Sequence, residues 1–263
     1  MKRLPYSLFA LLILLGCEND ENPKSSGTKL DYYIESYDLA GAGLEFTPQT
    51  KVTYQYNKAD KLSRYTVYSY SPDSKSFVKQ RHFDFSYTQD QVVKIKGFTP
   101  GSSVHYIEYS YTYLPDSRVS KITENNSGTG INSEANFTYN DTDEFVKVAY
   151  SFSNGASFEY AFFYDNGNIE NDKTTRGADL CNDGEYTYDD HLNPFNNLGY
   201  VDYFLNNISV NNKLTENINY VACSFPSFVP ESYSYEYNDK GYPTSATTFF
   251  KGGSKSEKKF FYR

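Results

Sequence analysis

Cysteine is the residue type best suited to covalent chemistry in this chain, which has three cysteines. The first, Cys17, comes after a basic start at Lys2 and Arg3 and an apolar run of eight residues, Leu8–Leu15. This order of positive charge, short apolar segment and small residue is typical of a secretory signal peptide. A helix needs about 20 apolar residues to cross a bilayer, so the run predicts a cleaved signal in residues 1–16 rather than a permanent span.

The pair Gly16-Cys17 resembles the lipobox of bacterial lipoproteins, in which the thiol is diacylated and the cysteine becomes the mature N-terminus. The resemblance implies lipidation of Cys17 and an outer-membrane anchor, because two or more acyl chains hold a protein stably. Residues 17–29 would then be the lipidated cysteine and an acidic, flexible tether. The acids directly after Cys17 are similar to the export signal of Bacteroides-type surface lipoproteins, which implies that the protein faces the cell surface. A plain solvated linker is the alternative.

The other two cysteines, Cys181 and Cys223, remain if Cys17 carries lipid. Two thiols in an oxidising envelope can pair. Such a bond would contribute about 4 kcal/mol in the chain-entropy description of disulfides. The sequence does not fix the distance between the two Cα atoms, so a disulfide and two buried thiols both stay open.

Histidines and acids carry the remaining candidate chemistry. None of His82, His105 and His191 has a partner at metal-binding spacing, and the chain has no Gly-x-Ser-x-Gly nucleophile motif. Four acids lie close together in the sequence: Asp179, Asp183, Asp189 and Asp190. Their spacing matches no EF-hand loop, so we interpret them as solvated turn acids. We predict no catalytic residue, no metal and no cofactor.

The regular pattern of the chain is interrupted in residues 171–232. Asn193 before Pro194 can begin a short helix there, because Asn caps a helix and Pro suits its first turn. The apolar residues of the segment need burial, which favours a lid over the core. Long irregular insertions also often carry function. On that second interpretation, the weak binding candidates are Asp189, Asp190, His191, Phe195, Tyr200 and Tyr203.

The charge balance excludes one class of partner. The signal segment holds two of the 25 Lys and Arg residues, so 23 remain against 33 Asp and Glu, a net charge of −10. No basic cluster offers a nucleic-acid footprint, and the overall sign opposes binding to phosphates. We therefore predict no nucleic-acid partner. The expected partners are the membrane, through the lipid on Cys17, and an envelope protein or a glycan.

Aromatic residues organise the rest of the chain, with 28 Tyr and 20 Phe. Alternation with period two, as in Tyr109, Tyr111 and Tyr113, predicts β-strands. Aromatic-x-Tyr pairs followed by Asn- or Asp-rich turns close at Tyr33, Tyr56, Tyr87, Tyr113, Tyr139, Tyr164, Tyr188, Tyr237 and Tyr262. The usual separation of about 25 residues holds two strands and two turns. The last-but-one gap is close to twice that length, which indicates that one such pair is missing.

This pattern predicts an all-β fold, a long antiparallel meander of about 16 strands with one irregular insertion. An open sheet of that size would expose long edges. We therefore expect the sheet to be strongly curved or closed into a barrel. Residues 30–263 would form this single domain.

Three segments, Tyr54–Asn57, Phe162–Asp165 and Tyr235–Asn238, are similar to the Tyr-Asp repeats of Rhs-type proteins. Taken with Gly16-Cys17, the chain resembles the Bacteroides lipoproteins that carry an uncharacterised domain with a porin-like β fold. The resemblance spans about residues 30–263. It implies a fold and a location, because the family has no assigned activity.

The expected function is a non-enzymatic binding or scaffold module, lipid-anchored in the outer membrane and facing the cell surface. One alternative is a surface protein that binds glycans, or hydrolyses them with scattered carboxylates whose separation depends on the fold. The other is an integral outer-membrane β-barrel, which needs an apolar, lipid-facing side on every strand. Acids such as Glu108 and Glu159 lie among the strand aromatics, and a lipid anchor would be redundant on such a barrel.

Overall fold

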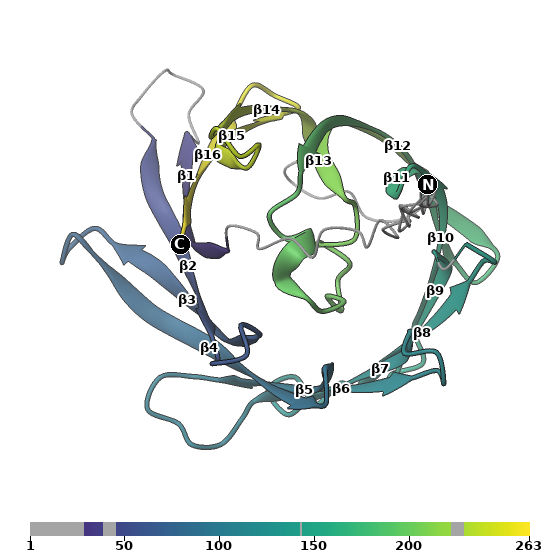
Figure 1. Ribbon diagram of the computed structural model, residues 1–263. Coiled ribbons are helices and arrows are strands. Elements are labelled where there is room, and N and C mark those ends of the chain that lie inside the picture. Colours follow the sequence, from purple (N-terminus) through teal and green to yellow (C-terminus); the bar gives the residue numbers. More distant parts are fainter. Residues whose placement is uncertain (1–28, 39–45, 143, 222–228) are drawn as a thin grey trace, which may run out of the picture.

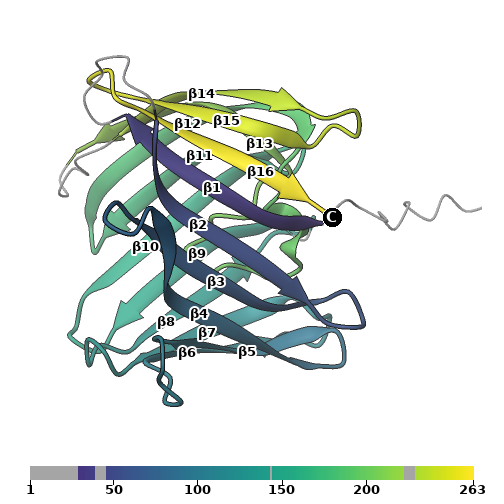
Figure 2. The same ribbon diagram turned by 90° about the vertical axis from the view of Figure 1, so that its left-hand side faces the viewer.

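The computed structural model describes residues 29–38, 46–142, 144–221 and 229–263. Within these ranges, sixteen strands form one antiparallel sheet in which each strand pairs with its neighbours in sequence. The first strand also pairs with the last, so the sheet closes into a barrel (Figures 1 and 2). The prediction of an all-β meander of about 16 strands closed into a barrel is confirmed. No helix in these ranges is long and apolar enough to cross a membrane.

The bounds of the elements follow the chain. They are β1 (Leu30–Asp38), β2 (Thr47–Tyr56), β3 (Leu62–Ser71), β4 (Ser76–Thr88), β5 (Gln91–Phe98), β6 (Ile107–Tyr113), β7 (Val119–Asn126), β8 (Ser133–Tyr139), β9 (Phe145–Phe152), β10 (Ser157–Asp165), β11 (Asn168–Arg176), β12 (Asp179–Leu192), the 3-10 helix η1 (Asn196–Leu198), β13 (Asn211–Tyr220), β14 (Pro230–Tyr237), β15 (Pro243–Phe250) and β16 (Lys255–Tyr262).

The hydrophobic core fills the lumen of the barrel. Along a strand, side chains point alternately into the lumen and out of the barrel. In β6, Ile107, Tyr109 and Tyr111 are buried in the core, while Glu108 and Ser110 between them lie on the other face. The aromatic alternation of the sequence is therefore the inward-facing half of each strand.

The recurring tyrosine at the end of every second strand binds a backbone carbonyl at the start of the strand before it. In one example, Tyr139 Oη donates to the carbonyl oxygen of Val119 at 2.7 Å. Equivalent bonds join Tyr56 to Leu30, Tyr87 to Leu62, Tyr113 to Val92, Tyr188 to Ile169 and Tyr262 to Pro243. The spacing of the repeat is thus explained by a hydroxyl that ties neighbouring strands together at one end of the barrel.

Changing Tyr139→Phe is expected to lower the free energy of unfolding by about 1–2 kcal/mol, because it leaves a half-buried carbonyl oxygen without its donor. Urea denaturation of the purified protein measures this loss. Tyr164→Phe is the matched control, since no bond of this kind is found for Tyr164 among the described residues, and it should change stability by less than about 0.5 kcal/mol. Equal losses in both variants would show that the hydroxyl bond does not stabilise the barrel.

The irregular insertion is much shorter than the predicted range 171–232. Strands β11, β12 and β13 and the start of β14 occupy most of that range, and its irregular described part is residues 193–210, here called the plug. Residues 222–228 lie outside the description. No aromatic pair is missing, because a single hairpin lengthened by the plug spans the gap from Tyr188 to Tyr237. The prediction was too wide because β11 and β13 are rich in Asn, Asp, Lys and Thr and carry little aromatic alternation.

Candidate ligand cavity in the barrel lumen

The plug leaves the end of β12 and enters the lumen before it returns to β13 (Figure 1). Asn193 Oδ1 accepts the N–H of Phe195 at 3.0 Å, and the short helix η1 follows, as the Asn-Pro pair predicted. The helix ends at Gly199, whose φ of 76° is the left-handed conformation that glycine adopts without steric cost. Leu198 is buried under this turn.

Tyr203 fixes the plug to one side of the barrel wall. Its ring packs against Tyr109 of β6 and Tyr150 of β9, with centroids 5.2 and 5.3 Å away. Its hydroxyl shares a hydrogen bond of 2.7 Å with Ser133 Oγ of β8, and Tyr150 Oη donates to its carbonyl oxygen at 2.6 Å. Side chain and backbone of the plug are therefore both held by the wall.

Two further predicted candidates also pack against the wall. Phe195 lies edge-on to Tyr33 and Phe260, with ring centroids 5.7 and 5.9 Å apart. Tyr200 lies edge-on to Phe85 of β4 at 5.0 Å. Burial of such aromatic side chains accounts for their presence, and all three candidates in the plug also line the cavity described next.

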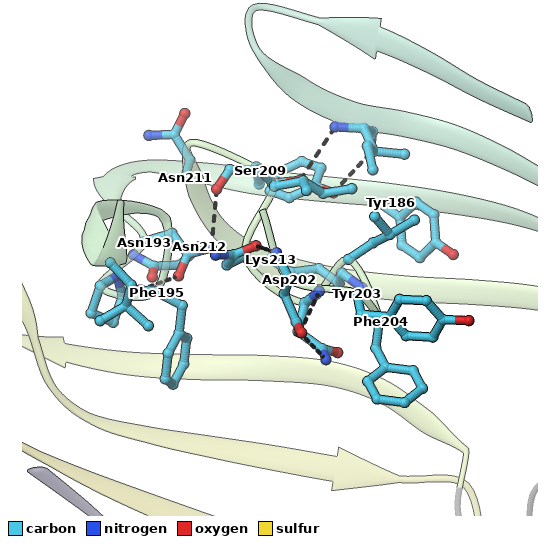
Figure 3. A pocket seen from close by; sticks show the side chains of 18 of the residues that line it. Tyr186, Asn193, Phe195, Asp202, Tyr203, Phe204, Ser209, Asn211, Asn212 and Lys213 are labelled. Atoms are coloured by element: carbon cyan, nitrogen blue, oxygen red, sulfur yellow. Dashed lines mark hydrogen bonds between the residues drawn. The ribbon is translucent and has the colours of Figure 1, made fainter. Parts of the chain in front are cut away.

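Between the plug and the opposite wall lies a cavity of about 860 Å³ (Figure 3). Most of its wall comes from β9–β16, with residues such as Tyr160, Tyr186 and Lys213. The plug contributes residues such as Asp202 and Phe204 on the facing side. The cavity is therefore a mostly aromatic chamber with a few charged and amide groups.

The charged groups of the wall form a connected network across β11–β14. Tyr186 Oη donates to Asp172 Oδ1 at 2.7 Å. Lys213 Nζ binds Glu216 Oε2 at 2.7 Å and lies 4.2 Å from the centroid of the Tyr186 ring, while Tyr233 Oη donates to Glu216 at 3.0 Å. Burial raises the pKa of Asp172 above its ordinary value, although the Tyr186 hydroxyl favours the charged form. Because β12 and β13 shift register after Thr187, Lys213 and Glu216 can face the same network from positions three residues apart.

Gly184 leaves room for the Asp172–Tyr186 pair. It lies opposite Asp172 in the β11–β12 register, and a Cβ atom there would collide with both Asp172 Oδ1 and Tyr186 Oη. Gly184→Ala is therefore expected to break the pair and cost about 1–3 kcal/mol of stability, because a buried carboxylate loses its donor. Chemical denaturation checks this value. Gly128→Ala, in a turn between β7 and β8, should change stability by less than about 0.5 kcal/mol; the same small effect at Gly184 would contradict the assigned role.

The other three predicted candidates gather at the end of β12 and are absent from the residues that line the cavity. Asp189 accepts the backbone N–H groups of His191 and Asn212, each at 3.0 Å, and the hydroxyl of Tyr237. The His191 ring stacks on Tyr237 at 3.9 Å, and its Nδ1 lies 2.8 Å from Asp190 Oδ1. Asp189 thus ties β12, β13 and β14 together, and the six candidates divide between this group and the plug.

The cysteines and histidines are placed as follows. Cys181 is buried and disulfide-bonded. Cys17 and Cys223 lie outside the described residues, so lipidation and the Cys181–Cys223 pairing stay predictions. His82 Nε2 is 3.9 Å from Asp84, and His105 Nε2 is 3.7 Å from Glu108. Within the described ranges, no group of three or more His, Cys, Asp or Glu could hold a metal ion.

The outer face of the barrel carries oppositely charged side chains from adjacent strands. At the midpoint of the wall, Lys147 Nζ and Glu159 Oε2 are 2.5 Å apart, beside the inward-facing Val148. Further pairs on this face are Arg64–Asp84, Lys94–Glu108, Lys121–Glu134 and Lys259–Glu257. Isolated aromatics such as Phe163 and Phe261 also point outward, 52% and 37% exposed. Charged pairs thus alternate with the aromatic interior over much of the circumference.

No protein-family model matches the chain, and no curated protein shows a significant match. Two solved structures are similar in fold. A porin-like protein from Bacteroides uniformis has a TM-score of 0.60 and 12% identity, covering 90% of this chain and 99% of that one. A porin-like protein from Bacteroides vulgatus has the same identity and coverage, with a TM-score of 0.47. The first likeness confirms the porin-like all-β fold that the family resemblance implied.

Proposed function

We propose that this chain is a non-enzymatic binding protein, tethered to the outer membrane by lipid, that holds a small ligand in its plugged lumen. The observation that carries the proposal is the cavity of about 860 Å³ between the plug and the wall. Small-molecule sites are typically concave, mostly apolar chambers of roughly 300–1,000 Å³ with a few fixed polar groups. The aromatic lining and the Asp172–Tyr186 pair match that description.

The attachment to the membrane is assigned to the lipid on Cys17 rather than to the barrel wall. Charged side chains lose their hydration in hydrocarbon, so charges on the lipid face of a membrane barrel cost about 2–4 kcal/mol for each Arg or Lys at the midplane. The pair Lys147–Glu159 lies on the outer face of this barrel, level with the buried Val148. A wall of this kind favours water, and the acidic residues after Cys17 support display at the cell surface.

The integral outer-membrane barrel is the second candidate, and the porin-like fold of the Bacteroides uniformis structure favours it. Outward aromatics such as Phe163 and Phe261 would contribute to the apolar band that it requires. The two candidates differ in what the outer wall contacts, lipid or water. Partitioning of the unlipidated chain therefore separates them, as described at the end of the Discussion.

A variant that fills the cavity tests the ligand role. Thermal shifts of the purified mature protein are measured against a panel of sugars, amino acids, amines and organic acids. We expect at least one class to raise the melting temperature, because binding to the folded state alone is stabilising. Ala246→Phe, on the lumen side of β15, should abolish the shift, whereas Thr247→Phe on the outer face should keep it. A panel without any shift, or shifts equal in both folded variants, would contradict the proposal.

A further inference from the structure

The charges that line the cavity do not balance. Three carboxylates line it: Glu124, Asp172 and Asp202. Two ammonium groups also line it, and both are bound to carboxylates that are not part of the lining. Lys213 Nζ binds Glu216 at 2.7 Å, and Lys258 Nζ binds Glu35 at 3.2 Å. The two lysines are thus already neutralised, and the three lining carboxylates remain in excess.

Asp172 shows the imbalance most clearly, because its side chain is deeply buried. Its hydrogen-bond donor is the neutral hydroxyl of Tyr186. Lys213 is near enough to favour the charged form of Asp172, but its ammonium group is bound to Glu216, and the net effect of burial is a raised pKa. Thr174, two positions along the same inward face of β11, has a buried hydroxyl with no hydrogen-bond partner in the described part of the chain. This part of the lumen therefore offers acceptors and lacks a positive charge.

The other two carboxylates also have neutral donors. Glu124 accepts the Ser133 hydroxyl at 3.0 Å. Asp202, on the plug, accepts the side-chain N–H of Asn206 at 2.7 Å. No Lys, Arg or His among the described residues forms an ion pair with Glu124, Asp172 or Asp202. The acids come from β7, β11 and the plug, so they surround the cavity instead of forming one surface cluster.

The aromatic lining suits a cation as well. The face of an aromatic ring is electrostatically negative and attracts an ammonium group within about 6 Å of its centroid. Lys213 Nζ already occupies such a place, 4.2 Å from the centroid of Tyr186. Further tyrosines line the same cavity: Tyr54, Tyr150, Tyr160, Tyr188, Tyr200, Tyr233 and Tyr235. The chain itself thus demonstrates the contact that a cationic ligand would make.

We propose that the lumen binds an organic cation, an ammonium group attached to an apolar body. The ammonium group supplies the charge that Asp172 and Asp202 lack, and the apolar body packs against the tyrosine rings. A neutral ligand would leave the carboxylates uncompensated, and an anion would be repelled. This inference rests on the proposed ligand role of the lumen and adds the chemical class of the ligand.

Isothermal titration of the mature protein with three matched probes tests the inference. Benzyltrimethylammonium carries the positive charge, benzyl alcohol is neutral, benzoate is negative, and maltotriose represents a sugar. We expect binding of the ammonium probe, at least about tenfold weaker binding of every other probe, and weaker ammonium binding at higher salt, where charges are screened. Equal or tighter binding of benzyl alcohol, benzoate or maltotriose would overturn the inference.

Charge-removing variants locate the site. Asp202→Asn and Asp172→Asn should each weaken the ammonium probe about tenfold, the size of effect expected for one nearby opposite charge in a partly screened site. Glu185→Gln removes the same charge from the outer face of β12 and should leave the affinity unchanged. If maltotriose binds and Ala246→Phe blocks it, the lumen is a ligand site and only the cationic class is wrong. If neither these probes nor the wider panel binds, both proposals fail.

Discussion

Replacing Cys17 by alanine is expected to move the protein from the membrane fraction to the soluble fraction of fractionated cells. Without the thiol, no acyl chain can be attached, and a single cleaved signal leaves nothing else in the sequence to hold the chain. Two or more acyl chains provide stable anchoring, whereas their loss removes about 0.8 kcal/mol for each buried methylene. The outer wall, with pairs such as Lys147–Glu159, supplies little affinity in their place. Ultracentrifugation followed by immunoblotting measures the distribution.

Ser25→Ala, a change in the tether beyond the cysteine, is the control and should leave the protein in the membrane fraction. Mass spectrometry of the wild-type protein should also show a diacylated or triacylated N-terminal cysteine. If the Cys17→Ala variant stays in the pellet after washing at alkaline pH, the anchor lies elsewhere. The integral barrel would then replace the tethered one.

Changing Tyr203→Ala is expected to cost about 3–5 kcal/mol of stability, the range for truncating a large buried aromatic. The substitution removes ring contacts with Tyr109 and Tyr150 and the hydrogen bond to Ser133. The plug would lose its main attachment to the wall. Chemical denaturation, with the barrel secondary structure followed by circular dichroism, gives the value.

The neighbouring Phe204 provides the control. Its ring is 65% exposed, so Phe204→Ala should cost less than about 1 kcal/mol. Tyr203→Phe separates the hydroxyl from the ring and should cost about 1 kcal/mol. If truncation of Tyr203 and of Phe204 has the same small effect, the plug does not pack on the wall in solution.

The sequence predicted the architecture because the same alternation is repeated along the chain. Inward tyrosines at every second position and tight turns after them leave few options for the topology. Asn57 shows how local the turn signal is, since its Oδ1 accepts the N–H groups of Ala59 and Lys61. Closure followed from the physical cost of two exposed edges on a sheet of this size. These features depend on neighbours in sequence, which a single chain displays.

The lumen could not be read from the sequence in the same way. Asp172, Lys213 and Glu216 were not among the predicted site residues. A charged residue at the same parity as the inward aromatics of its strand is a usable signal, but β13 carries few aromatics to define that parity. The register shift after Thr187 adds a further offset. That the plug turns inward is decided by contacts such as Tyr203 with Ser133, which lie 70 residues apart.

Phase separation of the unlipidated barrel tests the central claim most directly. The purified Cys17→Ala chain without its signal segment is mixed with a detergent that separates on warming, and both phases are assayed for folded protein. A tethered barrel with a water-facing wall is expected in the aqueous phase, and it should run as a monomer without detergent. Recovery in the detergent phase, or folding only when detergent is present, would contradict the account and identify the outer wall as a lipid-facing surface.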